Sequence, residues 1–593
     1  MVNWIPPSII FIVAALIIPF LSWRAQKVFV LAVPVFAMVN LFLMQEGSHW
    51  IFEFLGHDIV LAKVDKLSFL FAFVFIILHF IGMLFANHIK EHWEHSTAFL
   101  YAGGTLGVVF AGDFLSLYCA WEFMAGASVC MIWNSMREKS RRAGVRFILI
   151  HFFGGLCLLA GFIIHYKNTG SLEFGPILEG GLAYNLILIS FLINAAAPPF
   201  SAWLSDSYPE STPTGTVFLS GFTTKSAVYV LVRTFAGSDT LLWIGVAMAI
   251  YGVIFATLEN DMRRLLAYHV ISQVGYMVAG IGIGTELAIN GVCAHAFCHI
   301  IYKSLLFMGA GTILQQTGKS KLSELGGLYK YMKPIFYLYM IGAVSISAFP
   351  LFNGFVSKSL IVTAAAERHL FPAWILLTMV SCGTFLSVGL KLPYFAFFGK
   401  ESGLRPKKSP INMALAMGIG SFLCILFGVY PKLLYNMLPF PVDYKPYTVS
   451  HVVGSLQMLM FTGLAFTLLK KAPKTKISLD TDWFYRKGTD LFLWFVENPM
   501  FTFIEKTKKL FFESIPDFLT WYSFNPLSAL YMIAYIVAMP FIGDEKKKEL
   551  RDQMSAAEEN IFHGNGVRII SIGNSFVLIC SLLIIYLLIC FIF

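Results

Sequence analysis

Apolar stretches of about 20 residues recur from one end of this 593-residue chain to the other, and each can cross a bilayer as a helix. Hydrophobic residues make up 57% of the sequence and charged residues only 13%. A soluble domain carries about a quarter charged residues. The sequence therefore predicts an all-α polytopic membrane protein with about 15–17 transmembrane helices, and it excludes a soluble globular fold.

The alternation of apolar runs and polar connections divides the chain into six parts. These are three N-terminal transmembrane helices (1–96), a five-helix unit (97–236), an inverted five-helix unit (237–400), two further transmembrane helices (401–470), an amphipathic lateral extension (471–568) and a final transmembrane helix (569–593). Residues 46–64 are too polar to span and are expected to form a short external structure.

The extension mixes aromatic with charged residues over 482–523, as in a helix that lies along a membrane surface or against a neighbour. The apolar stretch 524–541 is expected either to span the membrane or to lie embedded sideways. Residues 544–560 are expected to form a solvated helix.

Lysine and arginine are concentrated in a few short connections, including 136–146, 318–333 and 405–409. By the positive-inside rule these loops face the cytoplasm, which places the N-terminus outside a cell's inner (plasma) membrane. Residues 4–22 lack a basic n-region and are interpreted as a retained first helix, not a cleaved signal peptide. The net charge of +9 thus reports orientation, and no basic patch with interleaved aromatic residues suggests nucleic acid binding.

The nine cysteines lie singly in apolar segments, without a C-x-x-C pair or a spacing that suits zinc or an iron–sulfur cluster. The sequence also contains no P-loop and no G-x-G-x-x-G fingerprint. We therefore expect no cofactor, no metal and no catalytic redox site in this chain. The energy for any transport would come from an ion gradient or from a partner.

Two of the predicted helices carry proline near mid-membrane, in AAAPPF (195–200) and AFPLFNGF (348–355). Proline removes a backbone hydrogen bond, and in lipid such a break persists only where protein or water satisfies the freed groups. The breaks fall on predicted helices seven and twelve, and this odd offset gives the opposite orientation expected of an inverted repeat. The helix after each break carries a lysine, Lys225 and Lys391.

Isolated charges lie inside several apolar stretches. Glu122 has no other charge within eight residues on either side, Lys225 has no local counter-ion, and Lys358 follows the second proline break. A charge at mid-bilayer costs about 2.5–3.5 kcal/mol on insertion scales. These residues are therefore either ion pairs between helices or members of a titratable relay. The relay is favoured because burial brings such groups toward the range in which they exchange protons.

One predicted helix carries His295, His299 and Lys303 at positions i, i+4 and i+8. The three residues span about 80° of one helix face, at steps of about 6 Å. Imidazole can take a proton on one nitrogen and release one from the other near neutral pH. The stripe therefore predicts a proton wire. Metal binding is a weaker interpretation, because no carboxylate or cysteine joins the stripe.

Six sequence blocks occur in a fixed order between residues 60 and 400. They are DKLSFLFAF (65–73), the Trp121–Glu122 pair, PPFSAWLSDSYPESTPTGT (198–216), ENDMRRLLAYHVISQVGY (259–276), HAFCHIIYKSLLFMGAG (295–311) and FNGFVSKSLI (352–361). In this order they resemble the antiporter-like membrane subunits shared by respiratory complex I, membrane-bound hydrogenases and Mrp-type cation/proton antiporters. The resemblance implies a horizontal polar axis across the bilayer centre, with half-channels at the broken helices.

By matching position, the resemblance assigns a proton relay to Glu122, Lys225, His295, His299, Lys303 and Lys358, and Lys391 is added here as a further candidate. The family usually has a lysine that partners the helix-five glutamate, and this chain has Asn194 in its place. Because asparagine cannot titrate, Glu122 is expected to contact Lys225 instead, directly or through one water. The alternatives are a first half-channel that runs differently or is inactive.

The helix-eight lysine and the GFVSK block most resemble the D-type subunit of Mrp antiporters, and the C-terminal extension resembles that of the distal complex I pump subunit. The sequence therefore predicts a proton-translocating subunit of a multisubunit monovalent cation (Na+)/H+ antiporter. Its partners would be other membrane subunits, with protons and Na+ as the candidate ions. The alternative is a proton-pumping membrane subunit of an NADH–quinone oxidoreductase or membrane-bound hydrogenase, and a third interpretation is a membrane anchor with vestigial charges.

Overall fold

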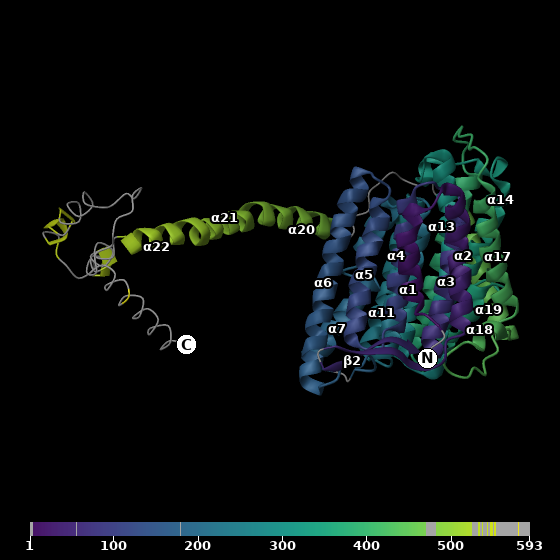
Figure 1. Cartoon of the computed structure of the whole chain (residues 1–593). Coiled ribbons are helices and arrows are strands. Elements are labelled where there is room, and N and C mark those ends of the chain that lie inside the picture. The colour runs from purple at the N-terminus through teal and green to yellow at the C-terminus, as the bar shows by residue number, and fades with distance from the viewer. Residues whose placement is uncertain are drawn as a thin grey trace. The chain divides into compact units, whose positions relative to one another are not determined.

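The computed structural model describes residues 4–54, 56–177, 180–469 and 482–524, with short pieces at 532–533, 536–537, 543, 546–549, 551–552 and 579. The chain divides into two compact units, Met1–Arg486 and Lys487–Phe593. The first unit is a bundle of long helices that run in nearly the same direction (Figure 1). Among the described residues, eleven helices are long and apolar enough to cross a membrane, which confirms the all-α polytopic fold.

The first part of the bundle consists of α1 (Pro7–Ile17), α2 (Trp23–Phe42), α3 (Lys66–Ala86), α4 (His92–Phe110), α5 (Phe114–Trp133), α6 (Glu138–Thr169), α7 (Gly181–Asn194), α8 (Ala202–Ser207), α9 (Gly215–Gly221) and α10 (Thr223–Phe235). The second part consists of α11 (Asp239–Leu258), α12 (Met262–Ile283), α13 (Glu286–Thr317), α14 (Lys333–Ile346), α15 (Asn353–Glu367), α16 (Phe371–Thr384), α17 (Ile411–Val429), α18 (Lys432–Tyr435) and α19 (Val449–Leu469). Helix α16 continues in π-helical form through Phe385–Lys391 and Tyr394–Phe398.

The short structure predicted at 46–64 is an antiparallel hairpin of β1 (Gly47–Phe54) and β2 (His57–Val64). The hairpin is attached to the bundle where α4 meets α5. Gly112 N donates to the carbonyl of Val60 at 3.0 Å, and Val60 N donates to Oδ2 of Asp113 at 2.8 Å.

The extension contains α20 (Asp482–Phe495), α21 (Phe501–Lys509) and α22 (Ile515–Phe524). The π-helical turns Val496–Met500 and Leu510–Ser514 join them into one long helix, at the position predicted for the amphipathic segment. The predictions for 524–541, 544–560 and 569–593 lie almost entirely outside the described residues.

Both helices predicted to be broken are interrupted at their prolines. The first consists of α7 and α8, and the second of α14 and α15. Each first half ends at an alanine with positive φ, +61° at Ala196 and +57° at Ala348. The N–H of the next residue bonds to the carbonyl five residues earlier, at 2.9 and 3.1 Å, the pattern of a Schellman helix end. The two breaks therefore share one backbone geometry.

A second correspondence joins the two five-helix units. Asp113 caps α5 and forms an isolated antiparallel bridge with Glu173, and Asp261 caps α12 and forms the same bridge with Lys321. Each bridge closes 60 residues of chain, from 113 to 173 and from 261 to 321. Because five crossings separate α5 from α12, the two bridges lie on opposite faces, as an inverted repeat requires.

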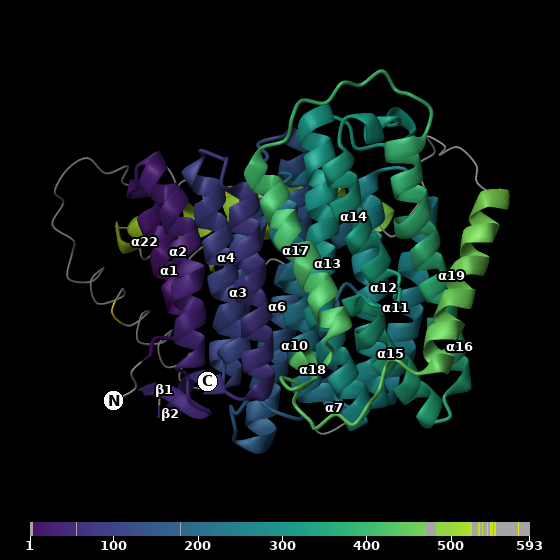
Figure 2. The ribbon, with the colours of Figure 1, turned by 90° about the vertical axis from the view of Figure 1, so that its right-hand side faces the viewer.

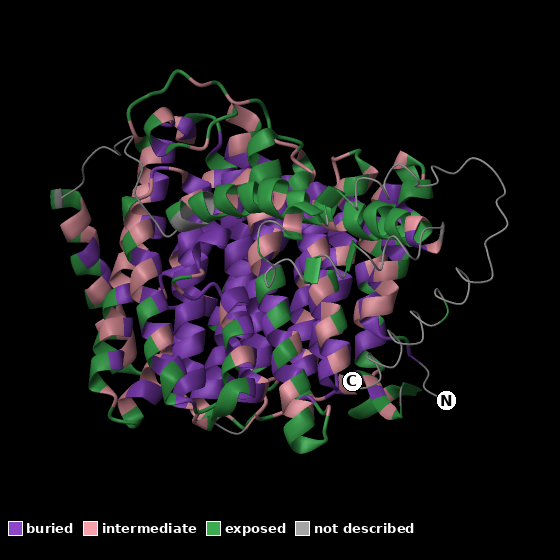
Figure 3. Ribbon diagram, turned by 90° about the vertical axis from the view of Figure 1, so that its left-hand side faces the viewer, coloured by how far each residue is buried: buried purple, intermediate pink, exposed green. Residues whose placement is uncertain are grey.

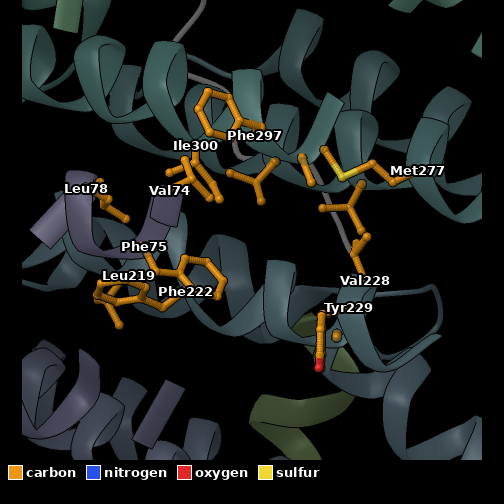
Figure 4. Close-up of a cluster of buried hydrophobic side chains, with 14 of the residues drawn as sticks. Val74, Phe75, Leu78, Leu219, Phe222, Val228, Tyr229, Met277, Phe297 and Ile300 are labelled. Atoms are coloured by element: carbon orange, nitrogen blue, oxygen red, sulfur yellow. The ribbon is translucent and has the colours of Figure 1, made fainter. Parts of the chain in front are cut away.

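Helix α13 is the centre of the bundle. It contacts α3, α9, α12, α14, α15 and α17, and 94% of its most apolar stretch is buried. Figure 3 shows that buried residues gather in the inner helices, whereas exposed residues lie on the outer ones. Figure 4 shows part of this core, where Phe75 of α3 and Phe222 have ring centroids 5.4 Å apart.

Glycines bring α11 and α12 into backbone contact. A β-carbon at Gly245, Gly252, Gly275 or Gly282 would lie between 2.1 and 2.5 Å from a backbone nitrogen of the other helix. Small residues at membrane helix interfaces permit this close approach. The pair therefore forms a fixed wall beside α13.

Replacing Ala348 with glycine is expected to leave the free energy of unfolding unchanged or to raise it, because a left-handed backbone costs an L-residue about 1–2 kcal/mol. The control is Ala343→Gly inside α14, which should lower that free energy by about 1 kcal/mol. Thermal unfolding of the detergent-solubilised protein, followed by circular dichroism, measures both. Equal losses in the two variants would contradict the strained helix end.

Candidate functional site

A row of buried polar side chains crosses the centre of the bundle, with its middle on α13. His295, His299 and Lys303 follow one another at single-turn intervals and are each 0% exposed. The rings of the two histidines have centroids 6.2 Å apart. Neither ring nitrogen of His299 nor Nζ of Lys303 has a hydrogen-bond partner among the described residues. Such buried groups are normally satisfied by ordered water, so water is expected in this part of the core.

Lys225 reaches the row from α10. Its Nζ donates to the carbonyl of Ser220 at 2.7 Å and to Oγ1 of Thr224 at 3.0 Å. Ser220 belongs to α9, which ends just before α10 begins, so the lysine satisfies a carbonyl at a helix discontinuity. Lys225 also lies close enough to His299 and Lys303 to interact with both electrostatically.

Lys358 lies at the other side of α13, on α15. Its Nζ donates to the carbonyl of Ile346, the last residue of α14, at 2.9 Å, and stands 4.9 Å from the centre of the Tyr276 ring. The neighbouring Ser357 hydroxyl is 3.1 Å from Nδ1 of His295. Through this contact α15 joins the α13 stripe, and the row runs from Lys225 to Lys358.

Lys391 lies apart from this row. Its Nζ donates to the carbonyls of Thr257 and Glu259 at 2.7 and 2.6 Å, and so caps the end of α11. A cation at a helix C-terminus is stabilised by the helix dipole. This capping gives Lys391 a structural explanation, and its part in a relay stays a prediction.

Of the two forms of contact expected between Glu122 and Lys225, the direct one is absent, so that part of the prediction was wrong. The contact through one water stays a prediction. The Lys225 ammonium is satisfied within its own segment, and Oε1 of Glu122 has no hydrogen-bond partner among the described residues. Glu122 instead turns toward α6, where a β-carbon at Gly155 would lie 1.9 Å from Oε1. The physical reason is that the discontinuity between α9 and α10 frees carbonyls, which bind the lysine locally.

His269 of α12 is a buried polar residue outside the set predicted from the sequence. Its Nε2 lies 2.6 Å from Oγ of Ser387, in the π-helical continuation of α16. It interacts electrostatically with Lys303, Lys358 and Lys391, and so lies between the central row and the lysine at the end of α11. A signal was present in the sequence, since His269, Gln273 and Tyr276 recur on one helix face.

A cavity of about 340 Å³ opens beside Lys358, between α15, α16 and α19, which lie together on one side of the bundle in Figure 2. Its lining includes Cys382, Ser455 and His451. The lining surface is mostly apolar, with Lys358, His451 and several hydroxyl groups as its polar members. The cavity therefore gives the end of the row at Lys358 open space with a few polar groups along it.

Three charged side chains near the first break, those of Arg146, Asp206 and Arg263, have structural roles. Arg146 and Asp206 form an ion pair at 2.6 Å with side chains 16% and 7% exposed. Arg263 is 2% exposed and donates to the carbonyls of Pro209 and Ser211 at 2.7 and 2.9 Å. These contacts fix the connection between α8 and α9 against α6 and α12.

The structure thus brings together five of the residues predicted for the relay. The other two predicted charged residues, Glu122 and Lys391, lie outside this group. The five are Lys225, His295, His299, Lys303 and Lys358. No group of three or more histidine, cysteine, aspartate or glutamate side chains that could hold a metal occurs in the part of the chain that the structure describes.

Residues 111–387, which carry this row, match the family model described as NADH:quinone oxidoreductase/Mrp antiporter, TM. The resemblance to the antiporter-like membrane subunits is thereby confirmed over this segment. Among curated relatives, the chain is 28% identical over 473 residues to an uncharacterized protein of Methanocaldococcus jannaschii, covering 74% of this chain and 97% of the relative.

Two Na(+)/H(+) antiporter subunits of one organism, Alkalihalophilus pseudofirmus, are also similar to the chain. The D-type subunit is 29% identical over 345 residues, covering 55% of this chain and 70% of the relative. The A-type subunit is 28% identical over 491 residues, covering 71% of this chain but only 60% of the relative.

Solved structures share the fold at low identity. The Mrp complex from Dietzia sp. contains a chain with a TM-score of 0.63 and 22% identity, covering 76% of this chain and 95% of that one. An archaeal membrane-bound sulfane sulfur reductase contains one with a TM-score of 0.67 and 22% identity, covering 91% and 99%. Respiratory complex I from Thermus thermophilus contains one with a TM-score of 0.62 and 21% identity, covering 72% and 98%.

Because Glu122 and Lys225 do not touch, the stability effects of Glu122→Gln and Lys225→Met should be additive within about 0.5 kcal/mol. The matched control is the contacting pair Arg146→Met and Asp206→Asn, whose coupling free energy should be about 0.5–3 kcal/mol. Double-mutant cycles on the purified protein, scored by thermal unfolding, measure both. A coupling above about 1 kcal/mol between Glu122 and Lys225 would contradict this geometry.

Proposed function

We propose that this chain is the proton-translocating membrane subunit of a multisubunit monovalent cation/proton antiporter. The observation that carries the proposal is the buried row from Lys225 through the α13 stripe to Lys358, which places titratable side chains on three packed helices. Lys225 and Lys358 also satisfy backbone carbonyls. A structural role leaves Lys303 and His299 unexplained, because Nζ of Lys303 and both ring nitrogens of His299 are buried without a hydrogen-bond partner among the described residues. The names of the relatives supply the ion class, protons exchanged against Na+.

Within this proposal, the α13 stripe carries protons between the two outer lysines. Lys303 takes a proton from the Lys225 side and passes it to His299, which accepts it on one ring nitrogen and releases another from the second. Both nitrogens of His299 are without a hydrogen-bond partner among the described residues, so both are available for this exchange. His295 receives the released proton, helped by the Tyr302 hydroxyl at 3.5 Å, and passes it to the neighbourhood of Ser357 and Lys358.

Proton exit is proposed through the cavity beside Lys358. The cavity reaches from Lys358 to His451, whose Nδ1 lies 3.3 Å from the hydroxyl of Tyr444. That hydroxyl lies 3.1 Å from Oγ1 of Thr363, another lining residue. The proposed orientation places the basic loops on the cytoplasmic side of the inner (plasma) membrane. In this orientation the end of the cavity at His451 faces the outside of the cell.

A second candidate is a proton-pumping module of a respiratory membrane complex, such as a quinone-reducing or hydrogen-evolving one. The specific observation in its favour is that the sulfane sulfur reductase chain shares the fold over 91% of this sequence, beyond the antiporter core. Purifying the native complex and identifying its other membrane subunits separates the two. Flavin or iron–sulfur subunits would select the respiratory module, and small membrane subunits alone would select the antiporter.

Lys303→Ala is expected to reduce proton movement at least tenfold, because the relay loses a group at its centre. Lys303→Arg should fail as well, since arginine stays protonated and cannot hand a proton on. The readout is the fluorescence of a pH probe in everted vesicles, normalised to the amount of inserted protein. Lys432→Ala, at a lysine of α18 outside the row, is the control and should retain wild-type activity. Wild-type activity in Lys303→Arg would mean that the residue acts only as a fixed charge.

A water-filled exit cavity should make Cys382 reactive toward a charged, membrane-impermeant methanethiosulfonate added outside. In a variant that retains Cys382 alone, the labelling rate should exceed that of a Cys119-only variant about tenfold, because thiolates form and react in water. Cys119 is the control, since it is exposed on the outer face of α5 and not in the cavity. Equal rates, measured by mass shift, would contradict an aqueous exit.

A further inference from the structure

The two broken helices correspond residue by residue, with a constant offset of 152. The left-handed alanines, Ala196 and Ala348, define this offset, and it makes Asn194 the counterpart of Ile346 as the last residue of each first half. In both helices the residue four positions further on is a proline, which has no N–H to donate. The carbonyls of Asn194 and Ile346 are therefore deprived of their helical partners in the same way.

The second break satisfies its carbonyl with a cation. The ammonium of Lys358 donates to the Ile346 carbonyl at 2.9 Å, at the negative end of the α14 dipole. Applying the offset of 152, the counterpart of Lys358 at the first break is Asp206, whose carboxylate is paired with Arg146 at 2.6 Å. The first break thus has the same electronegative helix end, but its chain supplies no cation from the corresponding position.

Three unpartnered polar side chains surround the first helix end. Asn194 is 0% exposed, and neither its Oδ1 nor its Nδ2 has a hydrogen-bond partner among the described residues. Ser190, one turn earlier and also 0% exposed, has an unpartnered Oγ. Oε1 of the half-buried Glu122 on α5 is likewise unpartnered. An uncompensated carboxylate and two buried neutral oxygens are costly unless a cation or a proton joins them.

Helix packing directs these groups toward one another. On α7, Ile193 faces α6, where its side chain would lie 3.5 Å from a β-carbon at Gly154, and Phe191 faces Trp121 of α5 with ring centroids 5.4 Å apart. At 100° per residue, Asn194 and Ser190 lie in the sector between these two directions. The carboxylate of Glu122 lies over Gly155, the residue that follows Gly154 on α6. The oxygens therefore share the junction of α5, α6 and α7.

We propose that this junction binds a monovalent alkali cation, Na+, between the Glu122 carboxylate, Oδ1 and the carbonyl of Asn194, and Oγ of Ser190. Hard oxygen ligands favour an alkali or alkaline-earth ion. One carboxylate balances one positive charge, whereas a divalent ion would leave an excess charge in the membrane. The carbonyl end of a half-helix is a cation site for which discontinuous membrane helices are suited. This proposal gives the cation of the proposed antiport a binding site. It rests on the proposed function for its physiological role, whereas binding of Na+ to the site can be tested by itself.

Sodium and a proton compete for the same carboxylate, because a protonated Glu122 has lost the charge that holds the ion. Among the titratable groups on the neighbouring elements, Tyr118 on α5 interacts electrostatically with Glu122. His151 on α6 bonds to the carbonyl of Phe147 in its own helix, and Lys225 on α10 bonds to Ser220. The Arg146–Asp206 pair is charged but internally balanced. Of all these groups, the Glu122 carboxylate is the one anion without a cationic partner within ion-pair distance among the described residues.

The test measures the unfolding temperature of the purified full-length protein in detergent, in NaCl and in choline chloride at equal ionic strength. Wild type should be stabilised by Na+ at pH 8.5, and less so at pH 5.5, because a ligand that binds only the folded state stabilises it. Glu122→Gln and Asn194→Lys should lose the Na+ effect, the second because its ammonium occupies the site. Ser190→Ala should weaken the apparent Na+ affinity about threefold or more.

Ser421→Ala provides the control, since Ser421 is also a buried serine with an unpartnered Oγ among the described residues, but on α17. It should retain the wild-type response to Na+. The proposal is overturned if wild type responds equally to Na+ and choline, or if Glu122→Gln keeps the Na+ effect. The readout is Na+ binding to the purified chain. A negative result therefore contradicts the sodium site but not the proposed proton translocation. Loss of proton movement without loss of the Na+ effect would contradict the proposed function but not the site.

Discussion

The architecture depends on one requirement, which is that every backbone carbonyl in the hydrocarbon region must have a donor. Proline denies that donor at two helix ends, and a discontinuity between α9 and α10 does so at a third. The protein answers at two of these places with a lysine ammonium, from Lys225 to Ser220 and from Lys358 to Ile346. The broken helices and the buried lysines therefore depend on each other. The ammonium satisfies the freed carbonyl, and the carbonyl stabilises the buried ammonium.

The sequence was sufficient for the parts of the fold that follow from hydropathy and proline. The polytopic bundle, both breaks and the α13 stripe follow from apolar run length, the missing proline N–H and the 3.6-residue period. The sequence was insufficient where a backbone group near a charged side chain competes with a distant side-chain partner. Charge alone suggested that Glu122 pairs with Lys225, but the Lys225 ammonium donates to the carbonyl of Ser220, five residues earlier in the chain.

Rigid packing on one side of the row contrasts with open space on the other. The glycines of α11 and α12 allow backbone contact, which fixes the wall that carries His269. Beyond Lys358, helix α19 is only 11% buried over its apolar stretch and borders the cavity. This contrast could not be predicted from the sequence, because a glycine-rich helix and a loosely held one have similar hydropathy. The rigid wall thus lies on one side of the row and the cavity on the other.

The bridges at Asp113–Glu173 and Asp261–Lys321 place matching positions of the two five-helix units at opposite faces of the bundle. The second bridge includes Lys321, which belongs to the basic connection 318–333, whereas the first includes Glu173. The same structural position therefore carries opposite charges at the two faces. Because loop lysines and arginines contribute to the orientation of a membrane protein, this difference distinguishes the two units although their backbones correspond.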